Sequence, residues 1–295
     1  MTKIVLPLLI LCLGAAAGAE DFVEAKPGKE AYYALYNKAV SAHMNSRLGV
    51  ACRLYSQAAG EAARLKKAEE EYGRAITLLA VANHTRGNYK QARKYYLKSL
   101  NYCRKHKLPE LGMAMSGLGR LYLDEKLPQK AGPPLKEACD LKYKDTESAD
   151  ALYNLADSIS SLGRLNEQLG NSNKAALYYL TALKLFEGAP TAFAFKVLDA
   201  EQMDSYPIIL YRTGLFYETN GEAEKGEVYY GRALAAFENW TGLDDRPALK
   251  ARVLEYRGRT LKALGRGAEA EAELKESAVL YRQVRQRPGK DGEAK

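Results

Sequence analysis

Six stretches of this chain repeat one spacing of small side chains, and that spacing restricts the fold to a narrow class. In each stretch a small residue is followed twelve positions later by a second, and seven positions after that by a third. The first members are Ala39, Ala80, Gly119, Gly163, Gly214 and Gly258. The second members are Ala51, Ala92, Ala131, Ala175, Gly226 and Ala270, and the third are Ala58, Ser99, Ala138, Ala182, Ala233 and Ser277. A period of roughly 40 residues containing two short helical patterns predicts an all-α solenoid.

Large side chains accompany the small ones at fixed offsets. One lies four positions before each first small residue, and another lies four positions after each second one. Steps of three, four and seven keep residues on one face of a helix. We therefore expect the small residues to let two helices approach closely while the large residues fill the space beside them. The large residues of the second set are Tyr55, Tyr96, Leu135, Tyr179, Tyr230 and Leu274.

Two segments, 213–234 and 162–183, carry this pattern most completely, and they resemble the tetratricopeptide repeat (TPR) family. The resemblance covers about residues 32–284 and implies a right-handed α-solenoid of about six helix-turn-helix repeats. The repeats are expected near 32–65, 73–106, 112–145, 156–189, 207–240 and 251–284. The first small residue recurs after 41, 39, 44, 51 and 44 positions, rather than the usual 34 or so. In this respect the chain is similar to the longer repeats of kinesin light chains.

The helix boundaries leave some choices open. In the fourth repeat the turn is placed at Gly170, with Gly163 as the competing position. Three prolines are expected to start helices after longer breaks, because proline suits the first helical turn: Pro109, Pro207 and Pro247. The longest break is expected from Gly188 to Asp204, and Pro133-Pro134 are unusual within a predicted helix.

Residues 1–19 have the features of a secretory signal peptide. Lys3 precedes an apolar run, Ile4–Ala17, and Ala17-Gly18-Ala19 fits a small-residue cleavage site. The alternative is a retained membrane anchor, although the run is short for a bilayer span. We therefore expect an exported protein, periplasmic or secreted, with no transmembrane anchor after cleavage. We expect residues 20–31 to form a polar lead and residues 285–295, which contain Pro, Gly and charged residues, to form a disordered tail.

The sequence contains no recognisable catalytic motif, so we do not expect an enzyme. No phosphate-binding loop, nucleophile motif or paired catalytic carboxylates occur, and no cofactor or metal site is expected. His43 and His84 occupy equivalent repeat positions, and we expect them to be solvated or groove-lining histidines; a metal-binding or proton-sensing pair is the alternative. The formal net charge is +8, but acids are interspersed with bases throughout, so no nucleic-acid partner is expected.

Three cysteines follow the predicted cleavage site: Cys52, Cys103 and Cys139. An odd number leaves at least one thiol unpaired. All three fall in second helices, where cysteine commonly serves as a small apolar filler. A Cys103–Cys139 disulfide between adjacent repeats is the alternative.

By the TPR resemblance, the residue after each first small position faces a concave groove. These residues are Val40, Val81, Arg120, Arg164, Leu215 and Arg259. Arg212 and Arg252 are placed near the same surface, and Ser116 and Ser160 lie one turn before Arg120 and Arg164. A guanidinium is suited to carboxylates. We therefore expect a cationic groove for an acidic or C-terminal segment of a protein or peptide partner. The alternative is that Glu167, Glu218 and Glu255 neutralise these arginines.

The leading interpretation of function is a non-catalytic, exported scaffold in envelope complex assembly. The alternative is a carbohydrate or cell-wall binding module, in which tyrosines form an aromatic ladder. The chain has 21 Tyr against six Phe, with doublets at Tyr95-Tyr96, Tyr178-Tyr179 and Tyr229-Tyr230. Leu261, Leu264, Leu274 and Leu280 have no following repeat to cover them. A homo-oligomer through the C-terminal helix is therefore also predicted.

Overall fold

The computed structural model describes residues 28–44, 47–143, 149–188, 200–238 and 247–286, and these form helices and turns only. The predicted signal peptide and the C-terminal tail beyond residue 286 lie outside the described residues. The helices are α1 (Glu30–Met44), α2 (Leu48–Arg64), α3 (Glu69–Thr85), α4 (Tyr89–His106), α5 (Leu111–Asp124), α6 (Pro128–Tyr143), α7 (Ala149–Gln168), α8 (Ser172–Gly188), α10 (Ala200–Thr219), α11 (Ala223–Glu238), α12 (Pro247–Ala263) and α13 (Gly267–Gln286).

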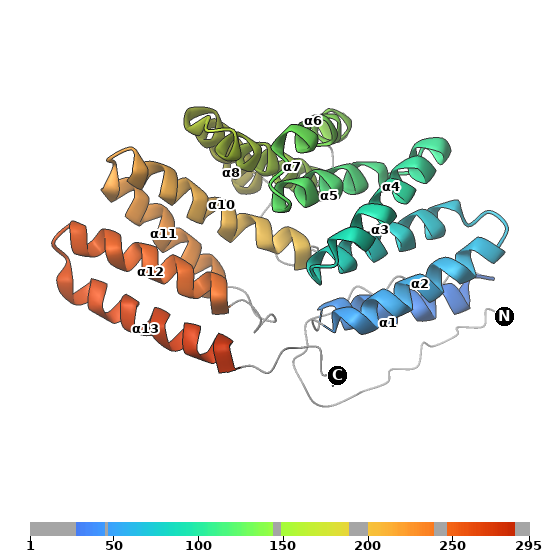
Figure 1. Cartoon of the computed structure of the whole chain (residues 1–295), viewed down its shortest axis with the longest axis horizontal. Helices are drawn as coiled ribbons and strands as arrows, with labels where there is room; N and C mark the ends of the chain where they lie inside the picture. The colour runs from blue at the N-terminus through green and yellow to red at the C-terminus, as the bar shows by residue number, and fades with distance from the viewer. Residues whose placement is uncertain (1–27, 45–46, 144–148, 189–199, 239–246, 287–295) are drawn as a thin grey trace, which may run out of the picture.

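Consecutive helices pack as six hairpins, and each hairpin contacts the next through its flanking helices. Figure 1 shows the hairpins following one another around an arch, from α1 and α2 at one end to α12 and α13 at the other. The predicted all-α solenoid is confirmed. None of the described helices is both long and apolar enough to cross a membrane.

The repeated small residues lie where the two helices of a hairpin come closest. A side-chain carbon added at Gly163 would lie 2.5 Å from the ring of Tyr179, and one at Gly214 would lie 2.6 Å from the ring of Tyr230. Both tyrosines are buried. Gly119 meets Leu135 and Gly258 meets Leu274 in the same way. The first small residue therefore makes room for the large residue of its own repeat, as the spacing predicts.

The turns inside the second to sixth hairpins use left-handed backbone, which ends a helix with little strain when glycine supplies it. The turn between α1 and α2 includes residues 45–46, which lie outside the described residues. Gly170 has a φ of +76° between α7 and α8, whereas Gly163 lies inside α7. The register that places the fourth turn at Gly170 is thus confirmed. In the third hairpin no glycine is available, and Lys126 takes the left-handed position with a φ of 60°.

The prediction for Pro207 is wrong. It lies inside α10, which begins at Ala200, seven residues before the proline. A proline within a helix loses one backbone hydrogen bond, but Pro207 is buried beside Ile209 and Leu210, whose packing offsets that loss. The predicted break from Gly188 to Asp204 is correspondingly shorter, and residues 189–199 lie outside the described part of the chain.

The other prolines behave differently from one another. Pro247 is the first residue of α12, as predicted, whereas Pro109 lies in the turn before α5. Pro133 and Pro134 are accommodated within α6, which begins at Pro128.

The C-terminal helix is better covered than its sequence suggests. Leu261 is fully buried, and Leu264, Leu274 and Leu280 are half-buried because α12 and α13 pack closely on each other. The exposed residues of α13 are mainly charged, polar or small, with Val279 as the large apolar exception. Within the described residues these leucines are therefore covered, at least in part, by their own hairpin, and the homo-oligomer stays a prediction.

None of the three described cysteines, Cys52, Cys103 and Cys139, forms a disulfide. Cys103 is fully buried, and its sulfur lies 3.6 Å from the Ser99 hydroxyl. Burial raises the pKa of Cys103 despite that hydrogen bond. The structure thus favours the filler role and shows no Cys103–Cys139 disulfide.

Candidate partner-binding surface

The first helices of the hairpins line the inner side of the curve. Among the described helices, α1 contacts α3, α3 contacts α5, α5 contacts α7, and α7 contacts α10. Within the described part of the chain, the second helices of neighbouring hairpins, such as α2 and α4, do not contact each other to that extent. Elements on the inside of a bend lie closer together than those on the outside, so the first helices form the concave surface of the arch (Figure 1).

The predicted groove arginines are held by acids of neighbouring repeats. Arg120 of α5 donates from Nη1 to both carboxylate oxygens of Asp157 on α7, at 3.1 and 2.9 Å. Arg164 of α7 reaches back to Asp124 at the end of α5. The side chains of Arg120 and Arg164 are 24% and 25% exposed. Both guanidiniums are therefore oriented by ion pairs while part of each remains accessible.

The remaining predicted arginines lie further along the array. Arg212 of α10 pairs with Glu167 of α7 and lies 3.5 Å from the hydroxyl of Tyr179. Arg259 of α12 pairs with Glu255 one turn earlier and is 61% exposed. Arg252 is exposed on the same helix. Glu167 and Glu255 thus do neutralise arginines, as the alternative held, but Glu218 instead accepts hydrogen bonds from Tyr230 and Thr260.

Three ionisable groups from three successive repeats meet at Asp124. His84 of α3 donates from Nε2 to one carboxylate oxygen at 2.6 Å, because an ionised carboxylate can only accept. Arg164 binds the other oxygen. Burial raises the pKa of Asp124, but the His84 hydrogen bond and the charge of Arg164 outweigh it and hold that pKa at about 2. This His84–Asp124–Arg164 cluster ties α3, α5 and α7 together on the inner face.

The other residues predicted to line the groove divide into core and surface. Ser116 is buried, and its hydroxyl lies 2.8 Å from that of Ser158 in the next repeat. Ser160 is half-buried and donates to the backbone oxygen of Asp157. Val81 is 2% exposed and belongs to the core, so its predicted place in the groove is wrong. Val40 and Leu215 are half-buried.

The second tyrosine of each doublet packs between helices rather than forming an exposed ladder. Tyr96, Tyr179 and Tyr230 are no more than 1% exposed. The first members, Tyr95, Tyr178 and Tyr229, are half-buried. Among the tyrosines whose side chains the structure describes, Tyr89 is the most exposed, at 37%. The described residues therefore offer little aromatic surface for stacking on sugar rings.

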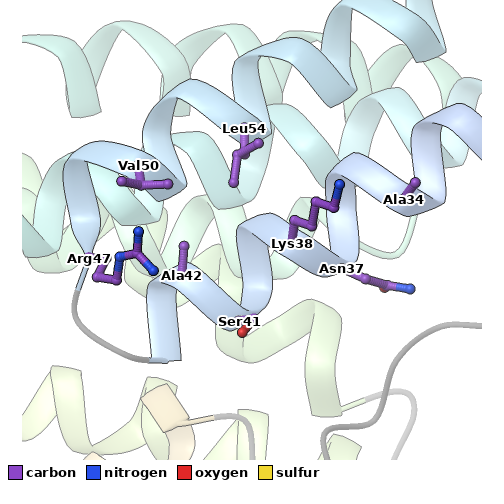
Figure 2. A pocket seen from close by; sticks show the side chains of 8 residues that line it. All are labelled: Ala34, Asn37, Lys38, Ser41, Ala42, Arg47, Val50 and Leu54. Carbon is purple, nitrogen blue, oxygen red and sulfur yellow. The ribbon is translucent and has the colours of Figure 1, made fainter.

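A separate groove of about 540 Å³ lies on the first hairpin. Figure 2 shows that its side chains come from both helices of that hairpin. They are Ala34, Asn37, Lys38, Ser41, Ala42, Arg47, Val50 and Leu54. The lining combines apolar side chains with two cations, Lys38 and Arg47.

The histidines have other partners than a metal. The ring of His43 faces that of Tyr55 at a centroid distance of 6.0 Å, and His84 binds Asp124. His106 stacks on Tyr102 at 4.4 Å. Within the described residues no group of three or more His, Cys, Asp or Glu side chains is placed to hold a metal ion.

Sequence reasoning missed the carboxylates that organise this surface, Asp124 and Asp157. Each lies about one repeat from its arginine, since Arg164 is 40 positions after Asp124 and Asp157 is 37 after Arg120. These separations approximate one repeat length, but that length varies along the chain, so a fixed offset does not identify the pairs.

By sequence, the chain matches no family model and no curated protein. Its likeness is to solved helical-repeat structures. BtubC (BKLC) from P. vanneervenii superposes with a TM-score of 0.61 and 21% identity, over 82% of this chain and 93% of that one. A Rap protein complexed with competence and sporulation factor gives a TM-score of 0.62 and 18% identity, over 88% and 72%. PilF of Pseudomonas aeruginosa gives 0.57 and 17%, over 88% and 98%.

These structures are TPR-repeat proteins, so the fold of this chain is that of a TPR-type solenoid. At identities of 17–21% the likeness establishes the fold.

Proposed function

We propose that this protein is a non-catalytic, exported scaffold that binds an extended segment of a protein or peptide partner along the inner face of its first helices. The observation that carries this proposal is the row of half-exposed arginines, each oriented by an acid of the same or a neighbouring repeat. A long, preorganised surface reduces the entropy cost of binding an extended chain.

Ion pairing orients these arginines without exhausting their donors. A guanidinium has five N–H donors in a fixed fork. Arg164 contacts Asp124 through Nη2, and Arg212 contacts Glu167 through Nη1. The remaining donors suit the carboxylates of an acidic or C-terminal partner segment. The acids paired with these arginines also lie on the inner face, so the partner segment needs cations or backbone N–H groups opposite them. This second requirement makes the recognition selective.

We predict that replacing Arg120 and Arg164 together by glutamine weakens partner capture at least about tenfold, because two charge-assisted contacts are lost. Glutamine is preferred to glutamate, which would be placed against Asp157 and Asp124. The measurement is a crosslinking pull-down from envelope extract, followed by mass spectrometry. Lys174→Gln with Lys184→Gln is the matched control, because both lysines are exposed on α8 and the charge change is the same.

Capture that is unchanged in the arginine variant would contradict binding through this inner face. Equal loss in the α8 control would mean that overall charge, rather than the groove, determines capture. Far-UV circular dichroism of each variant establishes that the solenoid is still folded.

Export is proposed from the N-terminal sequence, which lies outside the described residues. We predict that the chain recovered from the envelope fraction begins at Glu20, after cleavage behind Ala19. Ala19→Tyr should block cleavage, because a large side chain does not fit a small-residue cleavage site. Intact mass measurement distinguishes the products, and a full-length chain from Met1 in the wild type would contradict the prediction.

The alternative function, a carbohydrate or cell-wall binding module, has weaker support. Its main argument was an exposed aromatic ladder, and the doublet tyrosines are buried or half-buried. Recovery of glycan fragments without protein in the same pull-down would favour it.

A further inference from the structure

Helix α4 differs from every other described helix in the sign of its charges. It carries six Lys or Arg residues and no Asp or Glu. Each of the other described helices includes at least one acid. Five of the six cations are exposed. They are Lys90, Lys94, Lys98, Arg104 and Lys105.

These cations lie on the side of α4 that faces away from the protein. The buried residues of α4 are Ala92, Tyr96, Ser99, Leu100 and Cys103. Lys90, Lys94, Leu97, Lys98, Asn101 and Lys105 follow the three- and four-residue steps of the opposite stripe, and all are exposed. We call this stripe the basic face. α4 packs on α3 and α5, and Figure 1 places it on the outer side of the arch.

The basic face is not neutralised by its surroundings. Two acids of neighbouring helices reach α4, and both bind arginines at its margin: Glu125 binds Arg93 and Glu137 binds Arg104. Within the described residues no carboxylate forms an ion pair with Lys90, Lys94, Lys98 or Lys105. Lys98 lies over the ring of Tyr72 at 5.4 Å, which leaves its ammonium at the surface.

An apolar side chain lies in the middle of these lysines. Leu97 is 44% exposed between Lys94 and Lys98, and Tyr89 at the start of the helix is 37% exposed. A leucine flanked by lysines suits a bilayer, where the cations contact lipid phosphates and the leucine enters the acyl boundary. The same leucine gains nothing against a nucleic-acid backbone. Stacking on bases is also disfavoured, because Tyr102 is engaged with Tyr72 and His106.

We propose that the basic face of α4 binds the surface of an anionic phospholipid bilayer, leaving the inner face of the arch free for a partner. This inference does not depend on the proposed function, because it uses the opposite side of the solenoid. Binding is peripheral: a helix of this kind lies in the interface plane, held by charge and by shallow insertion of Leu97.

The test is flotation of the full chain with vesicles of phosphatidylglycerol in phosphatidylcholine, compared with phosphatidylcholine alone. The neutral vesicles report binding that does not depend on lipid charge. Every variant below keeps Lys3 and the apolar N-terminal run, so the contribution of that segment is the same in all of them. We expect the anionic vesicles to bind at least about tenfold more tightly, and this preference to disappear when salt rises from about 0.05 to about 0.5 M.

Lys94→Glu with Lys98→Glu should weaken binding to anionic vesicles at least about tenfold. Lys174→Glu with Lys184→Glu on α8 changes the net charge equally and should alter binding less than about threefold. Leu97→Gln should weaken binding by a few fold without changing its salt dependence. Lys90→Gln with Lys105→Gln is a milder second variant, should the first disturb folding.

Three results would overturn the proposal. The first is equal binding to neutral and anionic vesicles. The second is equal loss in the α4 and α8 variants, which would indicate a response to net charge only. The third is tighter binding of a DNA duplex than of vesicles through Lys94 and Lys98, which would assign the basic face to nucleic acid.

Discussion

Gly214→Val should lower the free energy of unfolding by about 3 kcal/mol or more, at the upper end of the penalty for overfilling a packed core. A side-chain carbon at Gly214 would lie 2.6 Å from the buried ring of Tyr230 and 3.1 Å from the backbone oxygen of Gly226. The Tyr230 residue is fully buried and its hydroxyl is held by Glu218, and the Gly226 oxygen belongs to the backbone of the facing helix. The α10–α11 hairpin must therefore separate.

Gly214→Ala gives a sharper test, because helix propensity alone predicts that this change stabilises the protein whereas the contact with Tyr230 predicts that it destabilises it. Alanine is better than glycine within a helix by about 1 kcal/mol. At Gly60, an exposed position of α2 with no atom near an added carbon, Gly60→Ala should therefore stabilise the protein. At Gly214 the contact with Tyr230 should outweigh that gain and give a net loss of about 1 kcal/mol.

Urea midpoints followed by far-UV circular dichroism report both changes, and hydrogen exchange should place the loss in α10 and α11. Adding Tyr230→Leu to Gly214→Ala should cost less than the sum of the single changes, because removing the ring removes the clash. Stabilisation by Gly214→Ala, or additivity with Tyr230→Leu, would show that the hairpin is not held at this distance.

This pairing of small and large residues is also the part of the structure that the sequence predicts best. Both members, such as Gly163 and Tyr179, belong to one repeat, and their separation is the same in all six. Contacts within a hairpin are thus determined by local spacing. The turn at Gly170 follows from the same register.

Contacts between repeats are harder to predict because the connections differ in length. Asp124 and Arg164 are 40 residues apart, whereas Glu167 and Arg212 are 45 apart. No single offset therefore identifies the pairs along the inner face. The start of α10 was missed for a different reason: Pro207 has the properties of a helix start, and only the packed structure shows the helix continuing upstream to Ala200.

The sequence predicts the arginines of the candidate surface and, as its alternative, their pairing with Glu167 and Glu255, but it does not predict the roles of Asp124 and Asp157. A list of arginines at equivalent positions describes a cationic groove. The paired carboxylates turn it into a surface of alternating charge, in which Arg120 and Arg164 are oriented rather than isolated. The selectivity of such a surface depends on the acids as much as on the arginines.

Asp124→Asn should lower the stability of the solenoid near neutral pH by about 2 kcal/mol. The pKa of Asp124 is about 2 in the folded chain, against about 3.9 in an unfolded one. Because the folded value is the lower one, the stabilisation is present above about pH 4 and is lost as pH falls toward 2. Asparagine cannot ionise, so it removes the stabilisation at every pH and leaves Arg164 and His84 without their shared anion.

The pH dependence separates this electrostatic effect from simple misfolding. The difference between wild type and Asp124→Asn, measured as urea midpoints, should be full at about pH 5 and approach zero near pH 2. Glu137→Gln is the control, since Glu137 and its partner Arg104 are 52% and 54% exposed, and such pairs contribute less than about 1 kcal/mol. A difference that stayed constant across this range would mean that asparagine disturbs packing. Because His84, Asp124 and Arg164 come from three consecutive first helices, the same variant should also loosen the inner face on which partner binding is proposed to depend.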